Sequence, residues 1–186
     1  MKTSFLIALL CSCIAAGTLH GQGPVPGPPV QLDLGIGGGV SMPVGTLNNA
    51  DNTGYHTGIK GRIRGITRLN LVGSLAYNRL PNKVGGESDV FWTAGGGIEY
   101  PVPSTMVEPY FGADVLYNSL SNSAAGAQAK TRFGGALGAG VSFSLPAFGT
   151  IDASVKYQLL NLVGKDTGEE TVSQIAANVS LMFNVM

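Results

Sequence analysis

The C-terminal segment, residues 172–186, shows the strictest alternation of apolar and polar side chains in this chain. One parity reads Ile175, Ala177, Val179, Leu181, Phe183 and Val185, and the other reads Gln174, Ala176, Asn178, Ser180, Met182 and Asn184. Successive side chains on a strand point to opposite faces, so this segment predicts a strand with one apolar and one polar face. Seven further segments alternate similarly, at residues 31–43, 53–65, 68–79, 89–101, 107–118, 131–145 and 149–160. Together they predict an all-β fold, an eight-stranded antiparallel barrel.

The connections between the predicted strands alternate in length. Four long connections are rich in Asn, Gly, Ser, Asp and Thr, and they read TLNNADN, LPNKVGGES, SLSNSAAGAQAK and NLVGKDTGEET. The three connections between them are short and read IT, VPSTM and PAF. Transmembrane β-barrels of the up-and-down type have short periplasmic turns and longer extracellular loops. Because the strand number is even, we expect both termini on the periplasmic side.

The first residues have the composition of an export signal. Lys2 precedes an apolar run from Ser4 to Gly17, and these 14 residues are too few for a membrane-spanning helix, which needs about 20. Small residues follow this run. We therefore expect residues 1–21 to be a signal peptide that is cleaved after Gly17 or after Gly21.

The rest of the chain is expected to form one domain. Residues 22–30 are rich in proline and glycine and predict an extended lead-in, because proline cannot donate a backbone hydrogen bond. Residues 31–186 contain all eight predicted strands and form the barrel. Both cysteines, Cys11 and Cys13, lie in the signal, so the mature chain is expected to have no disulfide.

Alternation alone does not say which face of the barrel is outside. A soluble barrel of the lipocalin type would place its apolar parity inward, around a ligand. Aromatic residues of the apolar parity distinguish the two arrangements because they gather near the strand ends. The ends beside the long loops carry Tyr55, Tyr77, Trp92, Tyr117, Phe133 and Tyr157, and those beside the short turns carry Tyr100, Phe111, Phe143 and Phe183. Two aromatic rings around an aliphatic band are typical of a membrane interface, so we expect this parity to face lipid.

The opposite parity carries the charges. Its basic residues are Lys60, Arg62, Arg64, Arg132 and Lys156, and its acidic residues are Asp33, Glu99, Glu108, Asp114 and Asp152. An arginine or lysine facing lipid would cost about 2–4 kcal/mol at the bilayer midplane. The interior of an eight-stranded barrel is just wide enough for side chains, so we expect ion pairs that fill it and leave no open pore. Asp33 is expected near Arg62 and Arg64, on the neighbouring strand.

In strand number, loop alternation, aromatic belts and amphipathic final strand, residues 31–186 resemble the small eight-stranded outer-membrane barrels, the OmpA/OmpX-like family. The resemblance implies insertion by the barrel-assembly machinery through the last strand, which in this family usually ends in an aromatic residue. Here Phe183 is the last aromatic, and Asn184, Val185 and Met186 follow it. No peptidoglycan-binding domain follows the barrel, so a wall-anchoring role is not expected. The resemblance implies a role in membrane integrity, adhesion or surface binding.

His56 is the one histidine expected in the mature chain, because His20 lies beside the cleavage region. Some outer-membrane barrels use a histidine with a serine or an acid to modify lipids, and Asp51 and several serines could assist His56. The alternative is a histidine at the barrel rim that bonds to loop groups. No spacing resembles a nucleophile elbow or a catalytic triad, so catalysis is not expected.

We expect no metal and no other cofactor. A single histidine without cysteine argues against zinc. Asp166, Glu169 and Glu170 cluster in the last long loop, but the alternating ligand spacing of a calcium loop is absent, so solvated carboxylates are the preferred interpretation. The glycine-rich stretches 35–40 and 134–140 lie within predicted strands and open no helix, which argues against phosphate-binding loops.

The sequence therefore predicts a non-enzymatic integral outer-membrane protein of a Gram-negative-type bacterium. Its expected partners are outer-membrane lipid, the barrel-assembly machinery during insertion, and surface partners that contact the long loops. The net charge is zero, which gives no reason to expect nucleic-acid binding. Three alternatives remain open: a lipid-modifying enzyme that uses His56, a soluble barrel that binds an apolar ligand, and a narrow channel.

Overall fold

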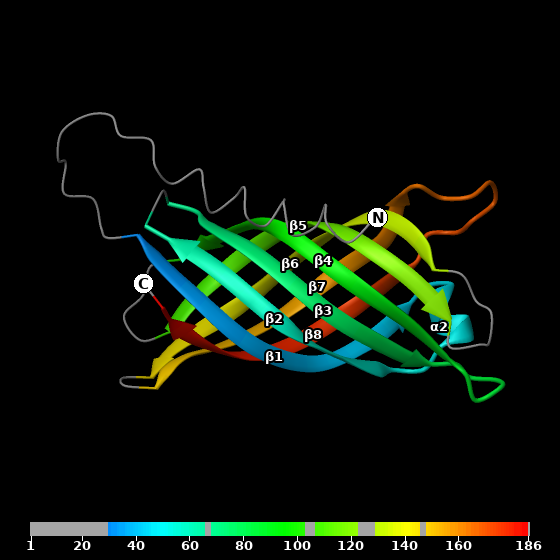
Figure 1. Ribbon diagram of the computed structural model, residues 1–186, viewed down its shortest axis with the longest axis horizontal. Coiled ribbons are helices and arrows are strands. Elements are labelled where there is room, and N and C mark those ends of the chain that lie inside the picture. The colour runs from blue at the N-terminus through cyan, green and yellow to red at the C-terminus, as the bar shows by residue number, and fades with distance from the viewer. Residues whose placement is uncertain (1–29, 66–67, 103–106, 123–128, 146–147, 186) are drawn as a thin grey trace, which may run out of the picture.

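The computed structural model describes residues 30–65, 68–102, 107–122, 129–145 and 148–185. They form a closed antiparallel barrel in which each strand pairs with its neighbours in sequence and β8 closes against β1 (Figure 1). The strands are β1 (Gln31–Val44), β2 (Gly54–Arg64), β3 (Asn70–Pro81), β4 (Ser88–Pro101), β5 (Val107–Asn122), β6 (Lys130–Leu145), β7 (Gly149–Val163) and β8 (Ser173–Asn184). The predicted eight-stranded up-and-down barrel is confirmed. The predicted signal peptide and residues 22–29 of the lead-in lie outside the described residues.

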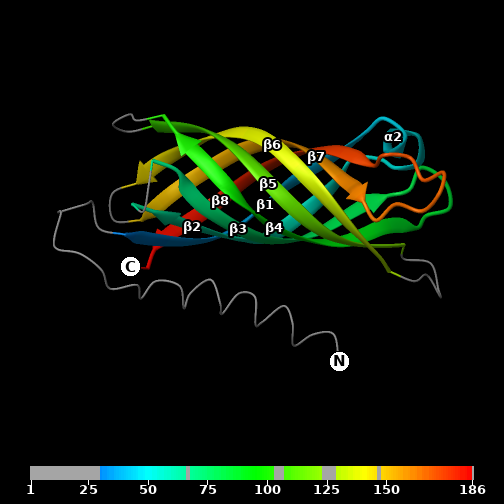
Figure 2. The same ribbon diagram turned by 90° about the horizontal axis from the view of Figure 1, so that it is seen from above.

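The two ends of the barrel differ. The strand ends that the short connections join, and both ends of the described chain, lie at one end, which we call the turn end (Figure 2). The long connections lie at the other, the loop end, and we name three of them L1 (residues 45–53), L2 (residues 82–87) and L4 (residues 164–172). L1 contains a single helical turn, α2 (Leu47–Ala50), which no helical periodicity predicts. No helix in the described part of the chain has the length and apolar character needed to cross a membrane.

Strand pairing keeps residues of one parity on one face around the barrel. Ile36 pairs with Ile59, Ile59 pairs with Leu75, and Leu75 pairs with Ala94. Directly opposed side chains lie on the same side of a sheet, so these residues form an apolar row. Ile36 and Ile59 are 63% and 58% exposed, which places the row on the outside.

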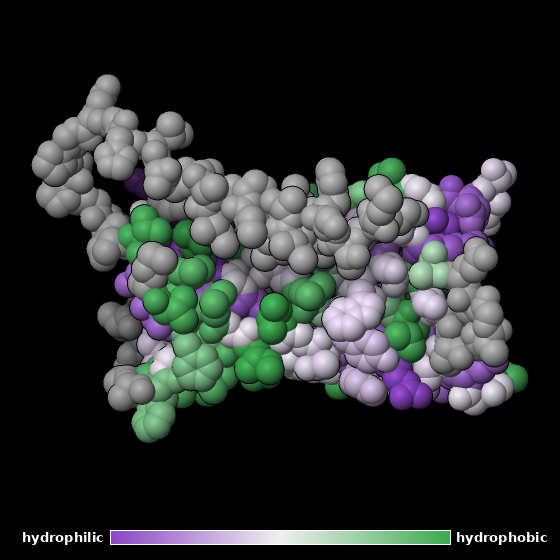
Figure 3. Space-filling view, in the orientation of Figure 1, coloured by the Kyte–Doolittle hydropathy of each residue, from purple (hydrophilic) through white to green (hydrophobic). Residues whose placement is uncertain are grey.

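Aromatic side chains lie on the same outer face. The strand aromatics that are more than a third exposed are Tyr55, Trp92, Tyr100, Phe111, Tyr117, Phe133, Phe143, Tyr157 and Phe183. Tyr77 pairs with Trp92 and packs edge-on against its ring, with 5.3 Å between the ring centroids. In Figure 3 apolar residues dominate the part of the visible surface towards the turn end, and hydrophilic residues gather at the loop end.

Several strands continue further towards the loop end than the sequence predicts, and β5 and β7 differ most. β5 extends to Asn122 rather than residue 118, because its polar last residues still pair with β4 as far as Asp89. β7 extends to Val163 rather than residue 160. Between the pairs Phe133–Val163 and Gly135–Leu159 the register shifts, which leaves residues 160–162 of β7 opposite one residue of β6. Such a bulge bends a strand and re-aims its side chains.

Candidate functional site

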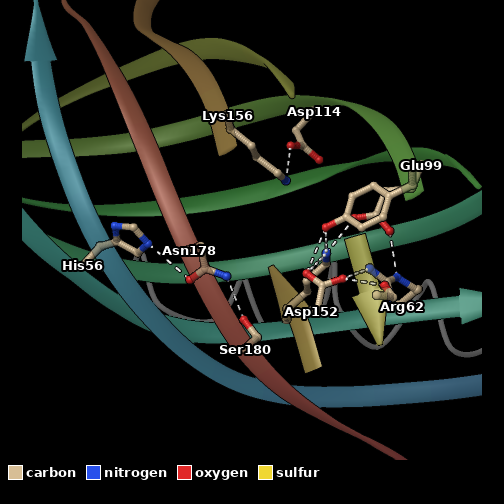
Figure 4. Close-up of polar contacts among 11 residues, drawn as sticks. His56, Arg62, Glu99, Asp114, Asp152, Lys156, Asn178 and Ser180 are labelled. Carbon is tan, nitrogen blue, oxygen red and sulfur yellow. Dashed lines mark hydrogen bonds and ion pairs between the residues drawn. The ribbon is translucent and has the colours of Figure 1, made fainter. Parts of the chain in front are cut away.

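A cluster of charged side chains crosses the barrel interior. The guanidinium of Arg62 (β2) is 1% exposed and donates from Nε to Glu99 Oε2 (β4) at 2.7 Å. Its Nη1 donates to Ser142 Oγ (β6) at 3.1 Å, and its Nη2 donates to Asp152 (β7). Figure 4 shows these side chains converging from different walls of the barrel. Because one arginine joins three walls, the cluster links strands that are not neighbours.

Lys60 and Tyr110 complete this central cluster. Lys60 Nζ lies 2.7 Å from Glu99 Oε1 and 3.0 Å from Asp152 Oδ1, so two cations face two carboxylates. The Tyr110 hydroxyl donates to Asp152 Oδ1 at 2.9 Å, and its ring lies about 5 Å from both cationic groups, where cation–π attraction operates. A Cβ at Gly140 would lie 2.4 Å from this ring, so glycine there makes room for it. We name Lys60, Arg62, Glu99, Tyr110, Ser142 and Asp152 the central cluster.

Further ion pairs flank the central cluster on both sides. Towards the turn end, Arg64 Nη2 lies 2.5 Å from Asp33 Oδ2, and Asn184 donates to Asp33 Oδ1 at 3.1 Å. Towards the loop end, Lys156 Nζ lies 2.6 Å from Asp114 Oδ2 (Figure 4). Arg62 is opposite Asp33 in the strand register, but its side chain reaches across the lumen instead.

Glu108 and Arg132 lie apart from these interior pairs. Glu108 forms no ion pair with any residue in the described ranges. Arg132 pairs with acids of L4 at the loop end rather than with another strand. Parity identifies a side chain that points inward, but it does not give the height at which the side chain meets a partner.

His56 lies in a polar network between the ion pairs and the loop end. Its Nδ1 is 3.0 Å from Ser41 Oγ, its Nε2 is 3.2 Å from Asn178 Oδ1, and Asn178 donates to Ser180 Oγ at 2.8 Å. A hydroxyl, an imidazole and an amide are also the parts of a nucleophilic relay. Ser41, however, is 0% exposed, so no substrate carbonyl reaches its hydroxyl in this structure. The arrangement satisfies buried polar groups and does not present a nucleophile.

A polar cavity of about 90 Å³ lies beside this network. Its lining includes His56, Lys60, Asp114, Lys156 and Asn178. A space of this size and polarity accommodates a few water molecules. The central cluster lies on the turn side of this cavity, where Arg62, Glu99 and Asp152 are buried.

The interior changes character near the loop end, where apolar side chains replace charged ones. Leu80, Phe91, Leu116, Ala136 and Leu160 are buried together, and Leu47, Leu120 and Val172 pack against them. We name the five buried residues the apolar plug. A cavity of about 240 Å³ adjoins it and is bordered by Leu47 of α2 and Asp89 of β4. The sequence did not predict this plug, because its parity pattern indicated an interior filled by ion pairs.

L4 is held against β6 by ion pairs at the rim of the barrel. Arg132 Nη2 lies 2.7 Å from Glu169 Oε2 and 2.9 Å from Asp166 Oδ2, and Lys130 Nζ lies 2.7 Å from Asp166. Hydrogen bonding to Arg132 lowers the pKa of Glu169 to about 2, and Lys130 lowers the pKa of Asp166. The buried amide of Asn161, in the β7 bulge, also donates to Glu169 and accepts from the backbone of Val172.

These contacts bear on the metal interpretation of L4. Two of its three acids are neutralised by side chains of this chain, which leaves little charge to attract calcium. In the described ranges of the chain, no group of three or more His, Cys, Asp or Glu side chains converges as a metal site.

Comparison with known proteins places this geometry among small membrane barrels. No family model matches the sequence, and no curated protein matches it. Among solved structures, Neisserial surface protein A (NspA) superimposes with a TM-score of 0.66 at 19% identity, covering 83% of this chain and 97% of that one. Ail, the attachment invasion locus protein of Yersinia pestis, superimposes with a TM-score of 0.50 at 18% identity, covering 83% of this chain. It was solved with the heparin analogue sucrose octasulfate (97% of Ail covered) and in a phospholipid bilayer nanodisc (100%).

The fold is therefore that of a small eight-stranded outer-membrane β-barrel, and the resemblance found in the sequence is confirmed at the level of fold. Within that class, this chain combines a charged cluster in mid-lumen with an apolar plug at the loop end.

Proposed function

We propose that this chain is an integral outer-membrane protein without enzymatic activity, with both termini periplasmic and the loop end as its working surface. The distribution of exposed and buried residues supports this most directly. Val179, Leu181 and Phe183 of the amphipathic β8 are 57%, 39% and 47% exposed, whereas Arg62 is buried. An apolar exterior around a charged interior is stable only if hydrocarbon surrounds the barrel. A soluble barrel that binds an apolar ligand would require the reverse.

Two tagged variants test location and orientation together. One carries an epitope between Gly85 and Gly86 at the tip of L2, and the other carries it after the last residue. The L2 epitope should be detected on intact cells, and the C-terminal epitope only after the outer membrane is permeabilised. The unboiled protein should also fractionate with outer membranes and migrate as a compact species on a gel. Recovery as a soluble exported protein, or the reverse accessibility of the tags, would overturn the proposal.

The channel alternative is disfavoured by the central cluster, which occupies the lumen. We expect planar-bilayer recordings of the purified protein to show no reproducible conductance steps. Arg62→Ala provides a positive comparison, because it removes the side chain that joins β2 to Glu99, Ser142 and Asp152 across the lumen. Reproducible steps with the unaltered protein would show that the cluster opens.

The loops are expected to contact surface partners that are not strongly anionic. Ail binds a heparin analogue in one solved structure. Here the loop-end cations are already engaged: Lys130 and Arg132 pair with L4 acids, and Lys165 donates to Thr171 Oγ1 at 2.6 Å. We therefore expect elution from a heparin column at low salt, on the order of 0.1 M, where exposed charges are only weakly screened. Retention to high salt would contradict this account.

A further inference from the structure

One buried acid at the loop end has no donor to satisfy it. Asp51 follows α2 in L1, is 0% exposed, and neither of its carboxylate oxygens has a hydrogen-bond donor among the described residues. An ionised carboxylate only accepts hydrogen bonds, so burying it without a donor or a cation is costly. The L4 acids, by contrast, are met by arginine and lysine.

The strand register places a second acid beside Asp51. Asp51 forms an isolated antiparallel bridge with Asn82, and two residues before Asn82 on β3, Leu80 pairs with Asp89 of β4. Residues two apart on a strand share a face, and directly opposed residues share it too, so both acids point to the barrel mouth. The Asp89 carboxyl lies within hydrogen-bonding reach of Asp51, and two carboxyl groups can bond to each other only if one carries a proton.

The acid pair lies where L1 is fastened to L2. Asn52 N donates to Pro81 O at 2.8 Å, and Lys83 N donates to Ala50 O at 2.8 Å. These two bonds flank Asp51 and hold L1 closed. Beside them, Leu47 of α2 and Asp89 both border the cavity of about 240 Å³ above the apolar plug. When L1 is closed, it therefore covers apolar surface at the barrel mouth.

We propose that Asp51 and Asp89 share one proton and form a pH-controlled latch, which holds L1 over the barrel mouth in acid and releases it as the pH rises. The pair fits a proton better than a metal ion, because Asp51 lines neither of the two interior cavities and its oxygens are closed to water. Lys83 also acts on Asp51, and its Nζ donates to the carbonyl oxygen of Asn48. On the Asp89 side, Lys130 and Glu169 border the same cavity as Asp89.

The direction of the pH effect follows from the folded-state pKa. Burial, reinforced by Asp89 and opposed by Lys83, raises the pKa of Asp51 from 3.8 to about 7. Because the closed state binds the proton more tightly than the open state, the latch is strongest below about pH 4. It weakens as the pH rises to about 7 and changes little above that.

The backbone amides of Asn52 and Lys83 report on the latch directly. Protection of these amides against hydrogen exchange, corrected for the intrinsic pH dependence, is measured on the whole protein in nanodiscs. Between pH 5 and pH 8 the protection should fall on the order of tenfold to a hundredfold, as expected for a pKa shift of this size. No change in protection would overturn the proposal.

Four variants separate the latch from a purely structural role. Asp51→Asn and Asp89→Asn each supply a permanent donor, so protection should remain high at pH 8. Lys83→Gln removes the opposing cation and should move the midpoint to higher pH. Asp166→Asn, in L4, is the matched control and should retain the unaltered pH dependence. The proton assignment is overturned if Asp51→Asn and Asp89→Asn both keep the pH dependence of protection. It is also overturned if millimolar calcium restores the closed L1 at pH 8.

Discussion

The central cluster and the apolar plug fill the same lumen by different physical means. The cluster places Arg62 and Lys60 against Glu99 and Asp152, and each side chain depends on a partner from another strand. The plug packs leucine and phenylalanine and requires only volume and shape. Charged side chains can cross a lumen and join distant walls, but they fail when one partner is lost. Apolar side chains tolerate loss better and can leave a cavity, as they do here.

The largest difference between the two regions should follow from Arg62→Met. This change leaves Glu99 and Asp152 buried with Lys60 as their one remaining cation, and removing one partner from a buried pair costs about 3–5 kcal/mol. Trp92 is the only tryptophan, so its fluorescence can follow unfolding by urea in lipid or detergent. Arg64→Met is the control, because Arg64 is 26% exposed and should cost less. If Arg62→Met and Arg64→Met lower the free energy of unfolding equally, then burial in the central cluster does not make an arginine more important for stability.

A core truncation, Leu160→Ala, tests the plug in the same assay. We expect a loss of about 2–4 kcal/mol, because a buried leucine loses both its transfer free energy and its contacts. The neighbouring outward residue serves as the control: Leu162→Ala should change stability by less than Leu160→Ala. If Leu160→Ala lowered the free energy of unfolding more than Arg62→Met, the apolar plug would be more sensitive to a single loss than the central cluster, contrary to this account.

Gly140→Ala tests the packing that supports the central cluster. The added Cβ would lie 2.4 Å from the Tyr110 ring and 2.7 Å from the Ala153 carbonyl oxygen, so either the ring or the backbone must shift. Overpacking of this kind costs about 1–3 kcal/mol in the unfolding assay. Gly73→Ala is the matched control, since nothing lies within 4 Å of its added Cβ. A neutral Gly140→Ala would show that Tyr110 is free to move.

The smallest effect is expected at the rim, with Arg132→Gln. Ion pairs at an exposed rim contribute little to stability, so L4 should loosen without unfolding the barrel. The lowered pKa of Glu169 means that its contribution is present above about pH 4.5 and lost as the pH falls towards about 2. Exchange at the Val172 amide, bonded to Asn161, measures this loosening. The role of Arg132 in holding L4 would be contradicted if Arg132→Gln left hydrogen exchange at Val172 unchanged. It would also be contradicted if L4 loosened as the pH rose.

The architecture was accessible from the sequence because each strand repeats the same two-residue period, and loop length fixes the order of pairing. Apolar residues such as Ile36 and Val179 lie outside, and charged residues such as Arg62 lie inside. Tyr110 was also within reach, since it shares the parity of Gly112 and Asp114.

Other features depended on distances along the barrel axis, which a parity pattern does not contain. Leu80 and Phe91 are apolar and inward, and only the closeness of the loops shows that they meet in a plug. Arg132 lies at the height of L4, so its partners are loop acids that were expected to be solvated. The pairing of Asp51 with Asn82 joins two loops through an isolated bridge, which no periodic pattern in the sequence predicts.

Closure of β8 onto β1 constrains how this protein associates with others. Each of the eight strands has both of its hydrogen-bonding edges occupied, so a foreign strand has no row of free amides and carbonyls on which to dock. Recruitment by strand addition is therefore unavailable to the folded barrel. Any lasting assembly must instead use side chains, either against the lipid-facing wall of another barrel or through the polar segments that project beyond the bilayer.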